Sequence, residues 1–189
     1  MDRRGPPRGA SAAGQAEVKG RTGTAPAWRL RRATPADVGP AAELRAFVLR
    51  EDLTRLGRYD AGRVRQRLLD GFVAGHTWVI EVGGEFAGCV ALRPEADGDA
   101  RCLEHFYLDP RLQGGGIGTA VLRELLARCD RDAVRVRLNV LSGSPARRLY
   151  ERHGFTLESE DAVDVFLVRE PGPRQPDASR RSSMQKTLS

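Results

Sequence analysis

The order of hydrophobic and polar residues divides the chain into strand-like and helix-like segments. Three consecutive runs have the composition and alternation of β-strands, at 77–82, 85–93 and 101–108. Gly83-Gly84 separates the first two runs, and this dipeptide is typical of a tight hairpin. The polar stretch 94–100 predicts a turn before the third run. We therefore expect three successive strands in the middle of the chain.

Apolar residues spaced three and four apart predict helices on either side of these strands. Thr34 followed by Pro35 is a typical helix start, and it predicts a first helix that extends to about Arg50. A second helix is expected at 60–73, and a short one at 145–153. A longer helix follows the glycines near residue 115, with one apolar side made of Ile117, Val121, Leu122, Leu125, Leu126 and Cys129.

Further strands are expected at 28–33, at 134–141 and as a final pair between 155 and 169. The predicted order is β-α-α-β-β-β-α-β-α-β. This order indicates one α/β domain in which helices flank a mixed, mainly antiparallel sheet.

Charge separates this domain from its two ends. The 189 residues carry a formal net charge of +6, but the segment 28–170 holds 22 basic and 22 acidic residues. The whole excess lies in 1–27 and 171–189, which are rich in Gly, Ala, Ser, Pro and Arg. We predict that both ends are disordered basic tails and that the neutral domain binds no specific nucleic acid.

No apolar run approaches the roughly 20 residues of a membrane-spanning helix, so no membrane association is expected. The three cysteines (Cys89, Cys102 and Cys129) are far apart and form no metal-binding pair. His76 and His153 also lack the spacing of metal ligands. These features predict a cytoplasmic protein without a metal site.

The sharpest motif is the loop Gln113-Gly114-Gly115-Gly116-Ile117-Gly118, which joins a predicted strand to a predicted helix. Glycines allow a ligand to approach the backbone, and the free N–H groups at a helix start favour a phosphate. The loop lacks the lysine of a Walker motif. It also lacks the last glycine of a dinucleotide-binding fingerprint.

The spacing Q-x-x-G-x-G after a strand resembles the GNAT superfamily of N-acetyltransferases, whose loop binds the pyrophosphate of acetyl-coenzyme A (acetyl-CoA). The segment YLDPRLQGGGIGTAVL is similar to the central motif of that superfamily, and LYERHGF to its next helix. The resemblance extends from about residue 28 to 169. It implies a GNAT-like fold for 28–170 and acetyl-CoA as the acyl donor.

The resemblance also implies which residues contact acetyl-CoA. They are Phe106, Tyr107, Leu108, Gln113, Gly114, Gly115, Gly116, Ile117, Gly118, Thr119, Asn139, Ser144 and Tyr150. The thioester is expected near Leu108, where a distorted strand frees an N–H group. One position departs from the superfamily, because Gly143 stands where an asparagine is frequent.

Acetyl transfer to an amine needs a base for the ammonium and an acid for the leaving thiolate. The resemblance makes Tyr150 the acid. Glu104 is four residues before Leu108, so strand alternation predicts that both face the same side, and Glu104 is one candidate base. His105 is the other candidate. A water chain, a base on the second predicted helix, and a substrate-binding role for Glu104 remain alternatives.

The expected reaction is direct acetyl transfer to a primary amine; a small-molecule amine is the preferred acceptor, and a peptide amine remains open. The alternative is a non-catalytic module that binds acyl-CoA as a sensor or interaction partner. The segments 50–75 and 94–100 would flank the acceptor, and their acidic residues are balanced by arginines. The resemblance also makes a homodimer an expectation.

Overall fold

The computed structural model describes residues 27–96 and 98–173. Both predicted tails therefore lie almost entirely outside the described residues, as does Asp97 in the turn at 94–100. Gly172 belongs to the folded part, since its N–H donates to Asp130 Oδ1 at 2.7 Å. Among the described helices, none is long and apolar enough to cross a membrane.

The described strands form one mixed, mostly antiparallel sheet in the order β1-β2-β3-β4-β5-β7-β6. Their bounds are β1 Trp28–Arg32, β2 Thr77–Val82, β3 Glu85–Pro94, β4 Ala100–Leu108, β5 Arg135–Leu141, β6 Thr156–Glu160 and β7 Asp164–Arg169. The predicted strands are confirmed, with ends that shift by one or two residues. Gly83 and Gly84 both have positive φ angles (62° and 90°), which the tight β2–β3 hairpin requires.

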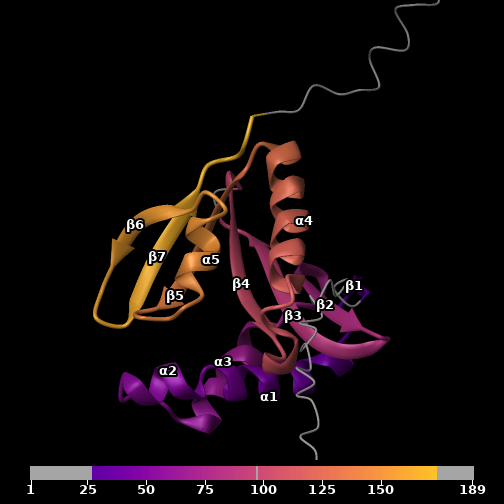
Figure 1. Ribbon diagram of the computed structural model, residues 1–189, viewed down its shortest axis with the longest axis vertical. Helices are drawn as coiled ribbons and strands as arrows, with labels where there is room; N and C mark the ends of the chain where they lie inside the picture. The colour runs from indigo at the N-terminus through magenta and orange to yellow at the C-terminus, as the bar shows by residue number, and fades with distance from the viewer. Residues whose placement is uncertain (1–26, 97, 174–189) are drawn as a thin grey trace, which may run out of the picture.

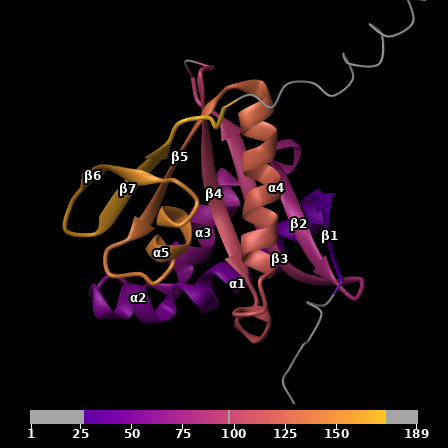
Figure 2. The same cartoon turned by 45° about the horizontal axis from the view of Figure 1, so that its top comes forward.

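Helices cover both faces of the sheet. They are α1 Val38–Val48, α2 Arg50–Arg55, α3 Ala61–Gly71, α4 Ile117–Asp132 and α5 Arg147–Glu151, with short 3₁₀ turns at 35–37, 74–76 and 110–112. Figure 2 shows α4 lying across one face of the sheet, with α1 and α3 on the other. This arrangement gives three layers, as expected for the predicted α/β class.

The main hydrophobic core lies between the sheet and α4 and α5. The six residues of the predicted apolar side of α4 are all buried there, which confirms the helical periodicity. A second, smaller cluster joins α1 and α3 to the opposite face, through Ala41, Ala42, Leu68 and Cys89.

The first helical region differs from the prediction. The helix expected to run to Arg50 is a 3₁₀ turn, then α1, then a separate helix α2. Thr34 is the N-cap, as predicted, and forms a capping box with Asp37: its N–H and hydroxyl both donate to Asp37 Oδ2, at 2.7 and 2.8 Å. None of the α2 residues is buried, so this helix has no apolar periodicity that could reveal it.

Candidate functional site

Strands β4 and β5 pair over a short distance and then separate. Their parallel register covers Ala100 with Arg135, Arg101 with Val136 and Cys102 with Arg137. The rest of β4, residues 103–108, therefore has no strand partner on its β5 side. Figure 1 shows the two strands diverging toward the end at which α4 begins. This divergence leaves a backbone edge free in the middle of the sheet.

Leu108 lies at the end of that free edge. The next residue, Asp109, donates its N–H to Ala87 O on the β3 side, at 2.8 Å. Because successive residues of a strand direct their backbone groups to opposite sides, Leu108 directs its N–H and carbonyl toward β5. Its carbonyl accepts a bond from the Gln113 side-chain amide at 2.9 Å. Its N–H can therefore donate to a carbonyl oxygen placed between the strands.

A β-bulge interrupts β4 just before this point. The pairing steps from Cys89↔Tyr107 to Ala91↔Glu104, so two residues of β4, His105 and Phe106, oppose one of β3, Val90. His105, at the bulge, has a φ of 54°, which a non-glycine residue seldom adopts.

The bulge inverts the side-chain alternation of β4. Leu103 and Leu108 both pack in the main core beside α4. Glu104 follows Leu103, so its side chain is on the other face, where it forms an ion pair with Arg93 at 3.0 Å. The expectation that Glu104 and Leu108 face the same side is wrong, because the extra residue changes the parity.

The opposite face of β4 carries a polar group packed beneath α1. Arg45 of α1 donates from Nη1 to the Tyr107 hydroxyl at 2.5 Å and lies 3.4 Å from His105 Nδ1. Burial lowers the pKa of His105, and the charges of Arg45, Arg67 and Arg93 lower it further. Burial raises the pKa of Tyr107 to about 12. At neutral pH, Tyr107 is therefore protonated.

The cysteines do not supply a nucleophile here. Burial raises the pKa of Cys89 to about 12, so the thiol stays protonated at neutral pH. Cys89 Sγ donates to the carbonyl of His105 at 3.3 Å and so supports the bulge. Burial likewise raises the pKa of Cys102 and of Cys129, each to about 11.

The glycine loop presents free backbone donors. Gly114 and Gly116 have φ angles of 77° and 86°, and α4 starts directly after them at Ile117. Within the described part of the chain, the N–H groups of 114–119 donate to no acceptor; the first bond into the loop runs from Ala120 N–H to Gly116 O. A Cβ on Gly114, Gly116 or Gly118 would meet no atom within 4 Å.

This geometry fits a phosphate group. Several N–H groups converge at the positive end of a 16-residue helix, with open space in front of them. Ile117 is buried in the core and so anchors the start of α4 beneath the loop. Thr119 lies in the first turn of α4 and is partly exposed.

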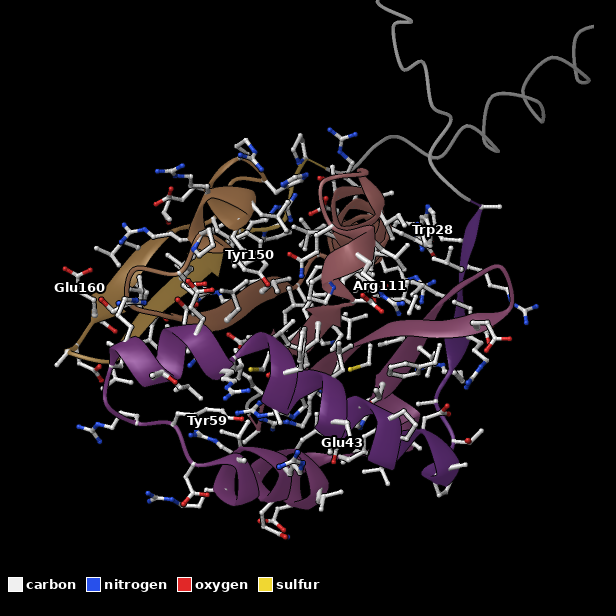
Figure 3. All side chains as sticks on the ribbon, turned by 60° about the horizontal axis from the view of Figure 1, so that its bottom comes forward. Trp28, Glu43, Tyr59, Arg111, Tyr150 and Glu160 are labelled. Atoms are coloured by element: carbon white, nitrogen blue, oxygen red, sulfur yellow. The ribbon has the colours of Figure 1, made fainter. Side chains whose placement is uncertain are left out.

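Tyr150 lies on α5, on the far side of the separated strands from the glycine loop, and Figure 3 labels it. Its ring is buried and meets Phe155 edge-on, with 5.6 Å between the ring centroids. Burial raises its pKa, and the nearby Tyr107 raises it further. No described residue bonds to the Tyr150 hydroxyl, and it is not a fully buried polar atom. The hydroxyl is therefore protonated and has no protein partner among the described residues.

Asn139 lies in the separated part of β5 and Ser144 just after the end of that strand, and each already has a protein partner, through its side chain and its backbone respectively. Asn139 Nδ2 donates to Asp164 Oδ1 at 2.7 Å. Ser144 donates its backbone N–H to Leu141 O and accepts from Arg147 in the turn that leads to α5. Their contact with a cofactor remains a prediction.

Gly143 has a φ of 77°, a conformation that asparagine tolerates better than most residues. Arg55 of α2 occupies the space beside it: a Cβ on Gly143 would lie 3.0 Å from Arg55 Nη1. Arg55 Nη2 also donates to Ser142 O at 2.6 Å. Sequence reasoning missed this contact, because 87 residues separate the two partners and nothing distinguishes Arg55 from its neighbouring arginines.

Comparison with known proteins agrees with this geometry. Residues 74–157 match the family described as "Acetyltransferase (GNAT) domain". The span begins just before β2 and ends in β6, so it contains the diverging strands, the glycine loop and α5. No curated protein matches the sequence.

Solved structures of similar fold include several acetyltransferases. The PaiA N-acetyltransferase of Thermoplasma acidophilum, in complex with coenzyme A, has a TM-score of 0.63 at 16% identity and covers 76% of this chain and 99% of its own. The ribosomal-protein-S18-alanine N-acetyltransferase of Escherichia coli has a TM-score of 0.59 at 15% identity, and the match covers 80% of this chain and 98% of that protein's chain. N-acetylglutamate synthase of Neisseria gonorrhoeae, in complex with coenzyme A and N-acetyl-glutamate, has a TM-score of 0.57 at 19% identity. The match covers 77% of this chain and 35% of that protein's chain.

The fold, the loop and the family match define the class of protein. Residues 74–157 match the GNAT acetyltransferase domain, and the described fold is GNAT-like, which together support an acyltransferase that uses acetyl-CoA as its donor. Among the described residues, no group of three or more His, Cys, Asp and Glu side chains could hold a metal ion.

Proposed function

We propose that the protein acetylates the primary amine of a small molecule, by direct attack of the amine on acetyl-CoA while both are bound. The observation that carries this proposal is the position of three features around the separated strands. These are the free N–H groups of 114–119, the edge of β4 at Leu108 and the hydroxyl of Tyr150. They suit the pyrophosphate, the thioester carbonyl and the thiolate of the donor, respectively.

In the proposed reaction a C–N bond forms and the C–S bond breaks. The amine nitrogen loses its proton to a base and attacks the thioester carbon. The Leu108 N–H stabilises the negative oxygen that results. The thiolate then takes the Tyr150 proton as it leaves. Burial raises the pKa of Tyr150, which keeps this hydroxyl protonated until the thiolate forms.

Glu104 is the proposed base. It lies on the α1 and α3 face of β4, beside the bulge, and its side chain is 26% exposed. His105 is the weaker candidate, because Arg45 can only donate, so the contact at Nδ1 uses the ring lone pair and leaves the proton on Nε2. Phe106 and Tyr107 complete the strand next to the thioester. Each of these roles is part of the proposal.

The first experiment replaces Tyr150 by Phe. Calorimetric titration should give an unchanged Kd for acetyl-CoA, because the hydroxyl has no partner to lose. Release of coenzyme A, measured with a panel of amines, should slow by about 100-fold or more. An unchanged rate would remove Tyr150 from the acid role.

The same assay assigns the base. Glu104→Gln keeps the shape of the side chain and should lower kcat more than His105→Gln does. Equal effects, or a larger loss with His105→Gln, would reassign the base. Tight binding of acetyl-CoA without turnover of any amine would overturn the proposed reaction and favour a sensor that only binds the donor.

A further inference from the structure

Arg45 is a charged residue on the side of α1 that faces the sheet. It follows Ala41 and Ala42 by four and three residues, and those two alanines are buried against β3 and β4 in the second hydrophobic cluster. Residues at this spacing lie on one side of a helix. Arg45 therefore continues an apolar stripe, a position at which an aliphatic side chain is the ordinary choice.

Arg45 also makes no ion pair with any carboxylate in the described part of the chain. Its Nη1 contacts the neutral groups Tyr107 and His105, and its Nε is fully buried without a hydrogen-bond partner. Arg31, Arg137 and Arg169, which are also half-buried, each reach at least one carboxylate within 3.0 Å. A partly buried cation without a counterion is costly unless an anion completes the site.

The surroundings of Arg45 are positive. Arg45, Arg67 and Arg93 are all close enough to His105 to lower its pKa. Among the described residues, the acidic group close enough to His105 to act on its pKa is Glu104, which raises it, and Arg93 already pairs with Glu104. The face of β4 beside the bulge therefore attracts anions, and it offers a single carboxylate to an ammonium group.

This positive group is adjacent to the proposed reaction centre. Tyr107, which Arg45 contacts, precedes Leu108 and is close enough to Tyr150 to raise its pKa. The Nη2 of Arg45 is not among the fully buried atoms and has no described partner, so it can still bind a ligand. A guanidinium in this state suits a carboxylate, whose two oxygens match its donors.

We propose that Arg45 binds a carboxylate of the acceptor, so that the enzyme selects small amines that carry a carboxylate, such as free α-amino acids. This inference rests on the proposed function. In it, Arg45 holds the carboxylate while Glu104 receives the proton of the ammonium group. The two ends of a zwitterionic acceptor thus meet opposite charges on one face of β4.

The test compares each standard α-amino acid with its own α-amide, as acceptors for wild type and Arg45→Gln. For the wild type, kcat/KM should favour the acid over its amide by about 10- to 100-fold. Arg45→Gln should remove this preference while the Kd for acetyl-CoA and the rates with the amides change little. Equal rates for acids and amides in the wild type would overturn the inference and leave the acetylation proposal standing.

Two further variants test whether Arg45 binds the acceptor carboxylate itself or acts only by holding α1 against β4. Tyr107→Phe breaks the contact between α1 and β4 but keeps the cation, so the acid preference should persist. Arg50→Gln, at an exposed arginine whose guanidinium lies 5.9 Å from the Tyr59 ring centre, is the matched charge control and should also keep it. Loss of the preference in either variant would show that Arg45 acts through the packing of α1 or through net charge.

A binding measurement tests the carboxylate site even if no amine is acetylated. In the presence of coenzyme A, the acids that bind should raise the Tm of wild type but not of Arg45→Gln, and their amides should raise neither. If no amine is acetylated, the proposed function fails, and this measurement still decides the role of Arg45. Stabilisation by acids and amides alike, or by neither, would overturn the carboxylate site.

Discussion

At the scale of single residues, Gly88 fixes the distance between β3 and β4 at the bulge. It is opposite Leu108, and a Cβ there would lie 2.3 Å from the carbonyl oxygen of Tyr107. No side-chain rotation can relieve a clash with backbone, so the strands would have to separate. Gly88→Ala should therefore lower the free energy of unfolding by about 1–3 kcal/mol.

Urea denaturation measures this loss, and Gly39→Ala is its control. Gly39 lies in α1 with no atom within 4 Å of a built Cβ, so alanine there should stabilise the protein by about 0.5–1 kcal/mol. Gly88→Ala should also lower kcat, because Leu108 would move. A Gly88→Ala protein as stable as the wild type would contradict the close approach seen in the structure.

The bulge also explains which residues could be placed from the sequence. Alternation placed Glu104 on the same side as Leu108 and failed, because the extra residue between them leaves no local trace in the sequence. His105 gives no warning of its positive φ, since glycine or asparagine would be the expected residue there. The glycine loop was found because its residue types are themselves the signal.

At the scale of elements, Asp37 joins the start of the first helical region to the edge of the sheet. Its carboxylate accepts two bonds from Arg31 of β1, at 2.7 and 2.8 Å, and Arg31 also bonds to Glu81 of β2. The Arg31 guanidinium holds the pKa of Asp37 well below its usual range. Asp37→Asn should lower stability at pH 7 by about 1–2 kcal/mol, because Arg31 is about a third exposed and partly screened.

The sign of the pH dependence follows from that lowered pKa. The unfolded chain protonates Asp37 at a higher pH than the folded chain does, so the ion pair contributes its full stability above about pH 4. That contribution is lost as the pH falls below this value toward the folded pKa. Urea titrations at several pH values should thus converge for wild type and Asp37→Asn in acid. Glu43→Gln, which removes an exposed pair with Arg65, should change little at any pH.

Elements with an apolar side were predictable, and those without one were not. The six buried residues of α4 and the strands β2 and β3 followed directly from periodicity. Helix α2 buries nothing and was missed. The separation of β4 from β5 was not predicted: the family resemblance implied only a distorted strand near Leu108, and pairing between distant strands depends on the whole sheet.

At the scale of the whole molecule, the net charge and the binding of the donor have separate origins. Acetyl-CoA is strongly anionic, yet the described part of the chain is almost neutral, with 22 basic and 21 acidic residues. The attraction of the folded domain for phosphate must therefore come from local groups, above all the N–H groups of 114–119. Residues outside the described part supply +5 of the net charge of +6.

This separation predicts how a shortened protein behaves. A chain of residues 27–173 keeps the contact between Gly172 and Asp130, so its Tm should match that of the full chain. Calorimetry should give the same Kd for acetyl-CoA in both, because the loop is intact. Binding of a short RNA, measured at low salt, should be confined to the full chain, since it alone carries excess positive charge. RNA binding by residues 27–173 would instead reveal a basic surface on the folded domain, and weaker acetyl-CoA binding would show that the ends of the chain contribute to the donor site.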